Sequence, residues 1–297
     1  MNPPASLSAP TAPRPPSWRS HLGQHPSLAL GTLLVLLWLL AAALGQLWTP
    51  GSPYEVNLSI KLLPPSGQHW LGTDALGRDV ASMLLLGAGQ SLIVGLVAVG
   101  IGLVLGTALG LLAAAWRGWI EQMVLRIADL AFAFPAVLLA IMLTALYGPS
   151  MVNAMVAIGI FNIPVFVRVA RASARVVWTR DFILAARVCG KGGWRITFEH
   201  VLPNIAPVLL VQATVQFALA ILAEAALSYL GLGTQPPEPS WGRMLTEAQT
   251  LLWQAPLLAL WPGLAIVLTV LGLNLLGDGL RDALDPRLSS LGHEEAE

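Results

Sequence analysis

Charged residues are scarce in this 297-residue chain, at 11% of the sequence, whereas hydrophobic residues make up 56%. Soluble domains usually carry about 25% charged residues, so the composition excludes an ordinary soluble domain and indicates an integral membrane protein. Lys and Arg together number 16, as do Asp and Glu, and a net charge of +0 provides no basic field for a nucleic-acid partner. The one cysteine, Cys189, excludes an intrachain disulfide, and no Cys/His cluster has zinc-binding spacing.

Catalytic motifs are also missing. The phosphate-binding pattern G-x-x-x-x-G-K-[ST] does not occur, because Lys191 in Gly190-Lys191-Gly192 is not followed by Ser or Thr. There is no G-x-S-x-G nucleophile elbow, and the tail after His293 lacks the second histidine of a zinc-binding H-E-x-x-H helix. We therefore predict that the chain is not an enzyme, has no catalytic residue and no metal site, and does not hydrolyse ATP by itself.

Apolar runs long enough to cross a bilayer recur along the chain, since a helical span takes about 20 residues. A charge-free stretch at 130–167 is divided by the turn signal Gly148-Pro149-Ser150, which makes two spans joined by a short loop. Together the runs predict an all-α integral membrane protein with six transmembrane helices. The predicted spans cover residues 28–48, 91–116, 130–147, 151–167, 205–230 and 256–277.

The segments outside the spans complete the predicted organisation. Residues 1–27 contain seven prolines and few apolar groups, which indicates a disordered cytoplasmic tail. A cleavable signal peptide ending near Ala41-Ala42-Ala43 is the alternative to a membrane anchor at 28–48, although the apolar run is long for a signal. The remaining predicted segments are an external loop at 49–84, a transmembrane core at 85–277 that includes a cytoplasmic loop at 168–200, and a cytoplasmic tail at 278–297.

The distribution of positive charge orients the chain in the membrane. If both termini are cytoplasmic, 13 of the 16 Lys and Arg residues lie on the cytoplasmic side, and Lys61, Arg78 and Arg243 lie outside. This asymmetry follows the positive-inside rule, so we predict that both termini are cytoplasmic. The loop at 168–200 carries seven of the cytoplasmic positive charges, and we expect a cytoplasmic partner to dock there.

This cytoplasmic loop combines small and basic residues. Ala186 and Gly190 are four residues apart, so a helix would place them on one smooth face that permits close approach of another protein. Arg187, Lys191 and Arg195 follow the same spacing and would form a basic stripe beside that face. The alternative is that these basic residues reflect the membrane topology alone.

The same loop carries a recognisable motif. Ala185-Ala186-Arg187-Val188-Cys189-Gly190, followed by Val201-Leu202-Pro203, resembles the E-A-A…G…I-x-L-P loop of ABC importer permeases, with Leu184 where that family often has Glu. In the family this loop forms a coupling helix that inserts into a groove of the ATPase subunit. The resemblance implies that the coupling-loop residues are Asp181, Leu184, Ala185, Ala186, Arg187, Gly190, Lys191, Trp194, Arg195, Leu202 and Pro203.

Further blocks at residues 69–80, 227–245 and 261–286 are similar to the dipeptide, oligopeptide and nickel permeases, and the similarity covers about residues 66–288. It implies the second, C-type permease subunit of an ATP-driven importer, with the type I ABC importer permease fold, in the cell inner membrane. The implied partners are a second, non-identical permease, cytoplasmic ATPases that bind ATP and Mg²⁺, an external solute-binding protein and the lipid bilayer. No cofactor is implied in this chain.

Two features lie inside the predicted spans. Glu224 is the one carboxylate within a span, about six residues below its outer end, where water could reach it. It either binds a peptide amino group or a gating partner in the translocation path, or is a hydrogen-bonded packing residue. Gly102, Gly106 and Gly110 form a small-residue ridge that predicts close helix packing, within this chain or against a partner.

The resemblance implies that the chain forms the translocation path for peptides delivered by the external binding protein. Nickel chelates or glutathione are the alternative substrates within the same transporter class. An ion-coupled secondary transporter is the alternative from another class, but such proteins usually place several ionisable groups near the midplane of the membrane. A non-transporting anchor protein would leave the matching external and cytoplasmic blocks unexplained.

Overall fold

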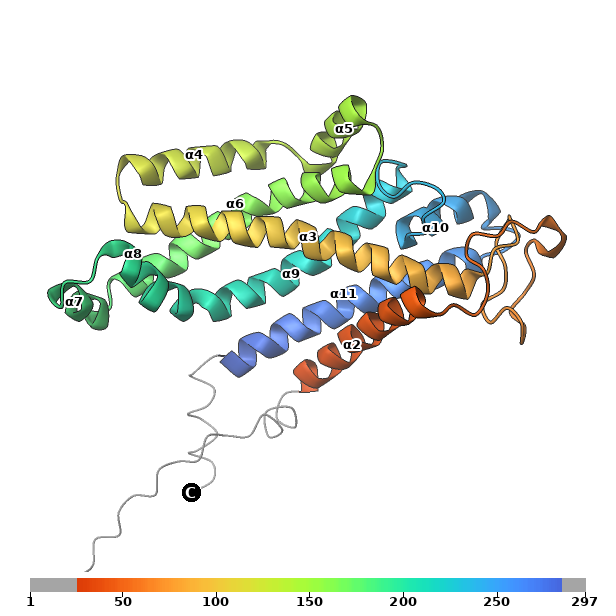
Figure 1. The fold of residues 1–297 in the computed structure, drawn as a ribbon, viewed down its shortest axis with the longest axis horizontal. Coiled ribbons are helices and arrows are strands. Elements are labelled where there is room, and N and C mark those ends of the chain that lie inside the picture. The colour runs from red at the N-terminus through yellow and green to blue at the C-terminus, as the bar shows by residue number, and fades with distance from the viewer. Residues whose placement is uncertain (1–25, 285–297) are drawn as a thin grey trace, which may run out of the picture.

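The computed structural model describes residues 26–284. The predicted tail at 1–27 therefore lies almost entirely outside the described residues, as does most of the predicted tail at 278–297. Residues 26–284 form helices joined by loops and contain no β-strand. The long helices lie side by side along one direction (Figure 1).

Five long helices and one pair of shorter helices, α4 and α5, make up the body of the molecule, and further short helices lie at its two ends (Figure 1). The α-helices are α2 (Pro26–Leu47), α3 (Val80–Ala115), α4 (Trp119–Ala133), α5 (Ala136–Tyr147), α6 (Met151–Trp178), α7 (Asp181–Val188), α8 (Gly193–Ile196), α9 (Leu202–Tyr229), α10 (Trp241–Ala248) and α11 (Leu257–Leu284). Single turns are η1 (Leu58–Ile60), η2 (Thr197–Val201), which is a π-turn, and η3 (Gln249–Leu251).

Six membrane crossings account for the path of the chain. Five helices, α2, α3, α6, α9 and α11, are individually long and apolar enough to span a bilayer, and α9 does so together with α8 and η2. Helix α3 ends near α7, whereas α6 begins at the opposite end of the molecule, so α4 and α5 together make the remaining crossing (Figure 1). The predicted six-span, all-α fold is confirmed.

The third crossing, predicted at 130–147, is made of two helices and begins before residue 130. Helices α4 and α5 are bent by 78° at the break between Ala133 and Ala136. Pro135 stands at this break, and a proline disfavours helical geometry in the residue before it and cannot donate a backbone N–H to the preceding turn. The bend therefore has a local covalent cause.

Several helices extend beyond the predicted spans. Helix α3 begins at Val80 rather than at Ser91, because the carboxylate of Asp79 accepts a hydrogen bond from the Ser82 N–H at 2.8 Å and caps the helix. Helix α6 continues past residue 167 to Trp178, so the first part of the predicted cytoplasmic loop at 168–200 is helical. The last helix also continues past residue 277, to Leu284.

Charged side chains support the extension of α6. Arg171 donates from Nε to Glu121 Oε1 of α4 at 2.7 Å, and Arg175 reaches the same carboxylate oxygen at 3.1 Å. Arg168 pairs with Asp129, also on α4, at 2.7 Å. These basic residues therefore tie the cytoplasmic end of α6 to α4 instead of beginning a loop.

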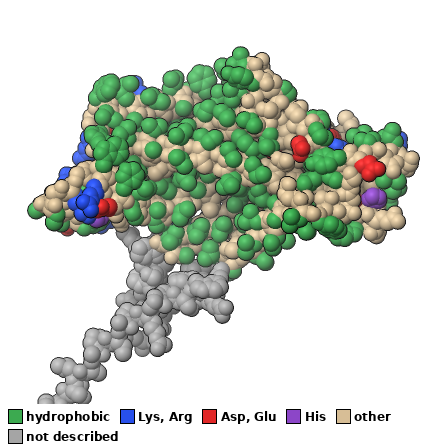
Figure 2. Space-filling model, viewed as in Figure 1, with side chains coloured by type: hydrophobic (Ala, Val, Ile, Leu, Met, Phe, Trp, Pro, Cys, Tyr) green, Lys and Arg blue, Asp and Glu red, His purple; other side chains and the backbone are tan. Residues whose placement is uncertain are grey.

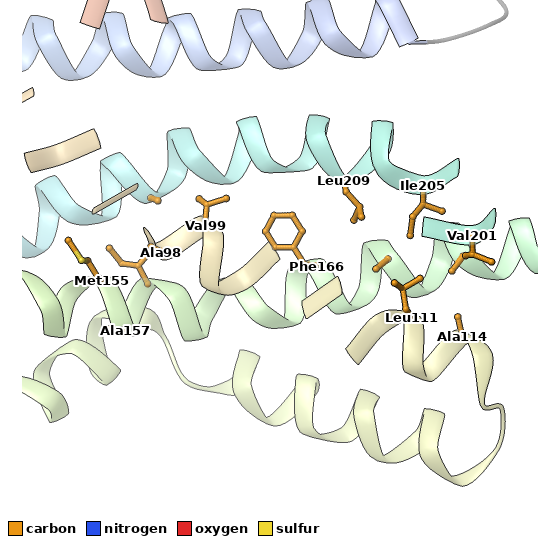
Figure 3. Packing of buried hydrophobic residues seen from close by; sticks show 14 of the residues in the cluster. Ala98, Val99, Leu111, Ala114, Met155, Ala157, Phe166, Val201, Ile205 and Leu209 are labelled. Atoms are coloured by element: carbon orange, nitrogen blue, oxygen red, sulfur yellow. The ribbon is translucent and has the colours of Figure 1, made fainter. Parts of the chain in front are cut away.

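The core of the molecule lies between α3, α6 and α9, and α3 shares its most extensive interface with α6. A Cβ atom on Gly106 would lie 2.5 Å from Ile163 O, and one on Gly110 would lie 2.7 Å from Val167 O. The glycine ridge that includes Gly102 thus packs within this chain, against α6. Beside it, Val99 of α3, Phe166 of α6 and Leu209 of α9 meet in one buried cluster (Figure 3).

The surface has the polarity expected of a membrane protein. Hydrophobic side chains cover the middle of the face shown in Figure 2, and charged side chains gather at its two ends. Lys and Arg side chains are concentrated at the end that carries α7 (Figures 1 and 2). The end with α7 is therefore the cytoplasmic end by the positive-inside rule.

Candidate coupling site and external cap

Helix α7 is anchored to the core by one of its faces. Ile183 is fully buried and Ala186 is 8% exposed, and both belong to the cluster formed by α3, α6 and α9. Asp181 lies in the first turn of α7 and Arg187 in the last, where each charge interacts favourably with the helix dipole. A displacement of α7 would therefore be transmitted to the core through Ile183 and Ala186.

The opposite face of α7 is apolar and exposed. Leu184 is 50% exposed and Val188 is 89% exposed, and Ala185 lies between them on the surface. The prediction that Ala186 contributes to a smooth outward face is wrong, because its side chain packs into the core. Sequence reasoning missed Val188, although its four-residue spacing from Leu184 was the available signal.

Gly190 ends α7 instead of extending its face. Its φ of +79° is left-handed, and its N–H donates to Arg187 O at 2.9 Å while the N–H of Lys191 donates to Ala186 O at 3.1 Å. This pattern closes a helix C-terminus and favours glycine. Because the helix ends at Val188, the predicted face shared by Ala186 and Gly190 and the predicted basic stripe are both wrong.

Glu199 brings two of the predicted basic residues together. Lys191 Nζ lies 2.7 Å from Glu199 Oε2, and Arg195 Nε lies 2.5 Å from Glu199 Oε1. Arg187 instead lies over the ring of Trp178, with its guanidinium carbon 5.1 Å from the ring centroid. Sequence reasoning did not single out Glu199, which lies four residues after Arg195 and so follows the usual spacing of helical ion pairs.

The remaining coupling-loop residues join α7 to the membrane helices. The Trp194 ring lies 4.6 Å from that of Trp116, which follows α3. After α8, the π-turn η2 leads without a break into α9, where Leu202 is partly buried and Pro203 is exposed. Pro203 lies in the first turn of α9, directly after the π-turn, and a proline cannot donate a backbone N–H to the turn that precedes it.

Glu224 lies in a buried polar contact between α3 and α9, and 1% of it is exposed. Ser228 Oγ donates to Glu224 Oε1 at 2.7 Å, and Ser91 Oγ of α3 donates to Glu224 Oε2 at 3.2 Å. The expectation that water reaches this carboxylate is wrong, since both of its oxygens have hydrogen-bond partners and the residue is buried. The geometry is that of a residue that links two helices.

The external end is closed by a second polar contact. Arg78 donates from Nε to Asp74 Oδ2 at 2.6 Å and also pairs with Glu247 of α10. Burial by itself would lower the pKa of Arg78. The neighbouring carboxylates of Glu247 and Asp74 raise this pKa by more than burial lowers it, so the net change is upward. Glu247 follows the recognised block 227–245 closely in the sequence, so this ion pair joins the recognised block 69–80 to the segment that comes directly after the other block.

The fold resembles that of a solved ABC transporter. The MetNI methionine ABC transporter, in a structure of its inward-facing conformations, matches with a TM-score of 0.58 and 18% identity over 68% of this chain and 96% of that chain. At this identity the likeness concerns the fold. It agrees with the type I ABC importer permease fold that the motifs implied.

Residues 106–290 match the model of the binding-protein-dependent transport system inner membrane component, and the chain belongs to this family. It is therefore a multi-pass inner-membrane permease subunit of an ABC importer. The dipeptide transport system permease protein DppC of Alkalihalophilus pseudofirmus is 44% identical over 92% of this chain and 91% of the relative.

Two further relatives have similar coverage. The glutathione transport system permease protein GsiD of Pectobacterium atrosepticum is 44% identical over 92% of this chain and 91% of its own length. The di/tripeptide transport system permease protein DppC of Pseudomonas aeruginosa is 43% identical over 92% of both chains.

Proposed function

We propose that this permease pairs with a second, non-identical permease and forms with it the translocation path for peptides delivered by an external solute-binding protein. The observation that carries the substrate class is the 43–44% identity to permeases named for dipeptides, di/tripeptides and glutathione. All three names denote short peptides or a peptide thiol. Glutathione is the second candidate substrate because one of these relatives is named for it.

The energy for transport comes from separate ATPase subunits that bind ATP and Mg²⁺. The exposed apolar face of α7 is the docking surface for such a subunit, since Leu184 and Val188 expose apolar groups at the cytoplasmic end. The buried face of the same helix contacts α3, α6 and α9 through Ile183 and Ala186. Closure of the ATPase dimer would thus move α7 and the core together as a rigid body.

Glu224 serves this movement as a link between α3 and α9 rather than as a ligand for the peptide. Support comes from its burial and from the hydrogen bonds that it accepts from Ser91 and Ser228. Moving helices that remain linked near their outer ends would act as one unit. A role in gating would then be mechanical.

Co-purification tests the docking surface. The tagged chain is extracted from native membranes in mild detergent, and the proteins that accompany it are identified by mass spectrometry. We expect a second permease and ATPase subunits with the wild type and with Leu184→Met/Val188→Ile, which keeps the apolar face. The variant Leu184→Asp/Val188→Asp should retain the second permease and lose the ATPase. A chain that purifies alone and still transports would overturn the proposal in favour of an ion-coupled carrier.

Uptake measurements test the substrate class. Cells that lack the chromosomal gene and carry it on a plasmid, with its native partners intact, are given labelled dipeptide or labelled glutathione. We expect dipeptide uptake that is lost without the plasmid. Uptake of glutathione alone would transfer the proposal to the second candidate, and uptake of neither would reject the peptide class.

A further inference from the structure

Two hollows meet at Trp194 on the cytoplasmic half of the molecule. The first is a polar pocket of about 370 Å³ beside α7, whose lining includes Trp116, Trp178, Arg187 and Lys191. The second is an apolar groove of about 520 Å³ between α3 and the start of α9. Trp194 lines both, so the hollows are neighbours and differ sharply in chemistry.

The polar pocket suits an anionic group with several acceptor oxygens. Arg187 and Lys191 contribute two positive charges to its lining. The indole N–H of Trp178 is buried and has no hydrogen-bond partner among the described residues. The nearby carboxylate of Glu199 is already paired with Lys191 and Arg195, so the local balance of charge stays positive. A phosphate would accept from the N–H and offset this charge.

The apolar groove suits a hydrocarbon chain. Leu103, Val104 and Leu112 line it from α3, and Phe198 and Leu209 line it from η2 and α9. Both α3 and α9 belong to segments that are long and apolar enough to span a membrane, where lipid chains are the surrounding medium. Trp194 stands between groove and pocket, which is the usual place of tryptophan at the boundary between hydrocarbon and headgroups.

We propose that an anionic phospholipid occupies both hollows, with its phosphate in the pocket beside Arg187 and one acyl chain in the groove along α3. A free phosphate would use only the pocket, and a neutral lipid would use only the groove, whereas the pair of hollows fits an amphiphile with negative charge. The bound lipid would bridge α3, α7 and α9. It would therefore hold the docking helix against the membrane core.

Native mass spectrometry of the intact transporter tests this site. The complex is reconstituted in bilayer discs that contain phosphatidylcholine with or without phosphatidylglycerol, released into detergent, and analysed for retained lipid. We expect the wild type to retain phosphatidylglycerol in preference to phosphatidylcholine. The variant Arg187→Gln/Lys191→Gln should bind phosphatidylglycerol about thirtyfold more weakly, given the usual contribution of each basic residue to anionic-lipid binding.

A matched control removes the same amount of charge from other exposed residues. Arg126 and Arg180 are exposed, and neither belongs to the lining of the two hollows. Arg126→Gln/Arg180→Gln should therefore retain the lipid as the wild type does. Equal loss in both double variants would reduce the effect to general surface charge and overturn the proposal.

Two further variants keep the test independent of the double substitution. Trp178→Phe removes the N–H but keeps the aromatic packing, and it should weaken lipid retention. Val104→Trp fills the groove and leaves both basic residues in place, and it should also weaken retention. Unchanged retention in both would overturn the proposal, whatever the behaviour of the charge variant.

The other occupants give different results. Binding of inorganic phosphate that is lost in Arg187→Gln/Lys191→Gln, with no preference of the wild type for phosphatidylglycerol over phosphatidylcholine, would show a free-phosphate site. Loss of the ATPase subunit from Arg187→Gln/Lys191→Gln, with lipid retention unchanged, would show that these residues contact a protein. Either result overturns the lipid site. Neither bears on the proposed substrate class, which is measured by uptake.

Discussion

The two ends of this permease are built differently. At the external end, Arg78 is 8% exposed and is paired with Asp74 and Glu247, so the charged groups there are satisfied within the chain. At the cytoplasmic end, Leu184 and Val188 on α7 are exposed to half or more of their surface. The external end also exposes apolar side chains such as Trp253, but it is held together by its own ion pairs, whereas the exposed face of α7 presents apolar groups that a partner can cover.

Because of this difference, we expect substitutions at the external end to change the stability of the chain and substitutions on α7 to change its binding to other subunits. Loss of a buried partner at the external end should destabilise the chain itself, because a charge is left without compensation. Substitutions on the exposed face of α7 should leave the chain folded and weaken its association with other subunits.

The largest effect is expected for Arg78→Ala. It leaves Asp74 and Glu247 without their shared partner, and we expect a loss of about 3 kcal/mol in stability, at the lower end for buried ion pairs because the Glu247 side chain is 30% exposed. Heating in mild detergent followed by size-exclusion chromatography measures it. Arg243→Ala removes a less buried partner of Glu247 and should cost about 1 kcal/mol or less. Equal losses would show that Arg78 does not close the external end.

Adjacent alanines on α7 offer a sharper contrast. Ala186→Leu inserts volume into the core and should cost about 2 kcal/mol of stability in the same heating measurement. Ala185→Leu lies on the exposed face and should change stability by less than about 0.5 kcal/mol while altering ATPase co-purification. The reverse order would mean that α7 packs on the core with its other face.

A smaller loss is expected where α7 ends. Gly190→Ala places a side chain at φ +79°, and we expect a cost of about 1 kcal/mol and a weaker hold on the ATPase subunit. Gly192→Ala is the matched control, because Gly192 has φ −71° and alanine is unstrained there. Thermal stability of the two variants gives the comparison, and a stable Gly190→Ala protein would contradict the proposed helix ending.

The smallest effect is expected for Glu224→Gln. The amide oxygen can still accept from Ser228 and the amide N–H can donate to Ser91, so stability should fall by less than about 1 kcal/mol. Peptide uptake should remain near the wild-type rate. Glu224→Leu removes both hydrogen bonds and should cost about 2 kcal/mol. Lost uptake in a stably folded Glu224→Gln protein would assign the carboxylate a direct role in transport.

Much of the fold could be predicted from the apolar runs and the positive charges. Hydrophobicity and the positive-inside rule act on local sequence, so the number of crossings and the orientation followed from where the apolar runs and the basic residues lie along the chain. The ends of α3 and α6 could not be predicted in this way. They depend on the Asp79 cap and on ion pairs with Glu121 and Asp129, which lie on α4, far from α6 in the sequence.

The sequence predicts which residues form the candidate coupling loop, but it does not predict which way their side chains face. The motif located the loop around Ala185 and Gly190, whereas the tertiary structure decided that Ala186 faces inward and that Leu184 and Val188 face outward. Periodicity shows which residues share a helical face, but it cannot show which face meets the core when the helix is short and both faces are apolar. That choice depends on the packing of Ile183 against helices distant in the sequence.

The class of protein and the six crossings followed from the amino-acid sequence, because both depend on residue type and local spacing, and a local motif predicts the place of the coupling loop. The tertiary structure decided that the glycine ridge packs on α6, that Glu224 links α3 to α9, and that Arg78 joins Asp74 to Glu247. These are pairings between residues far apart in the chain. They are selected by close packing and by the cost of burying a polar group without a partner, which no local pattern records.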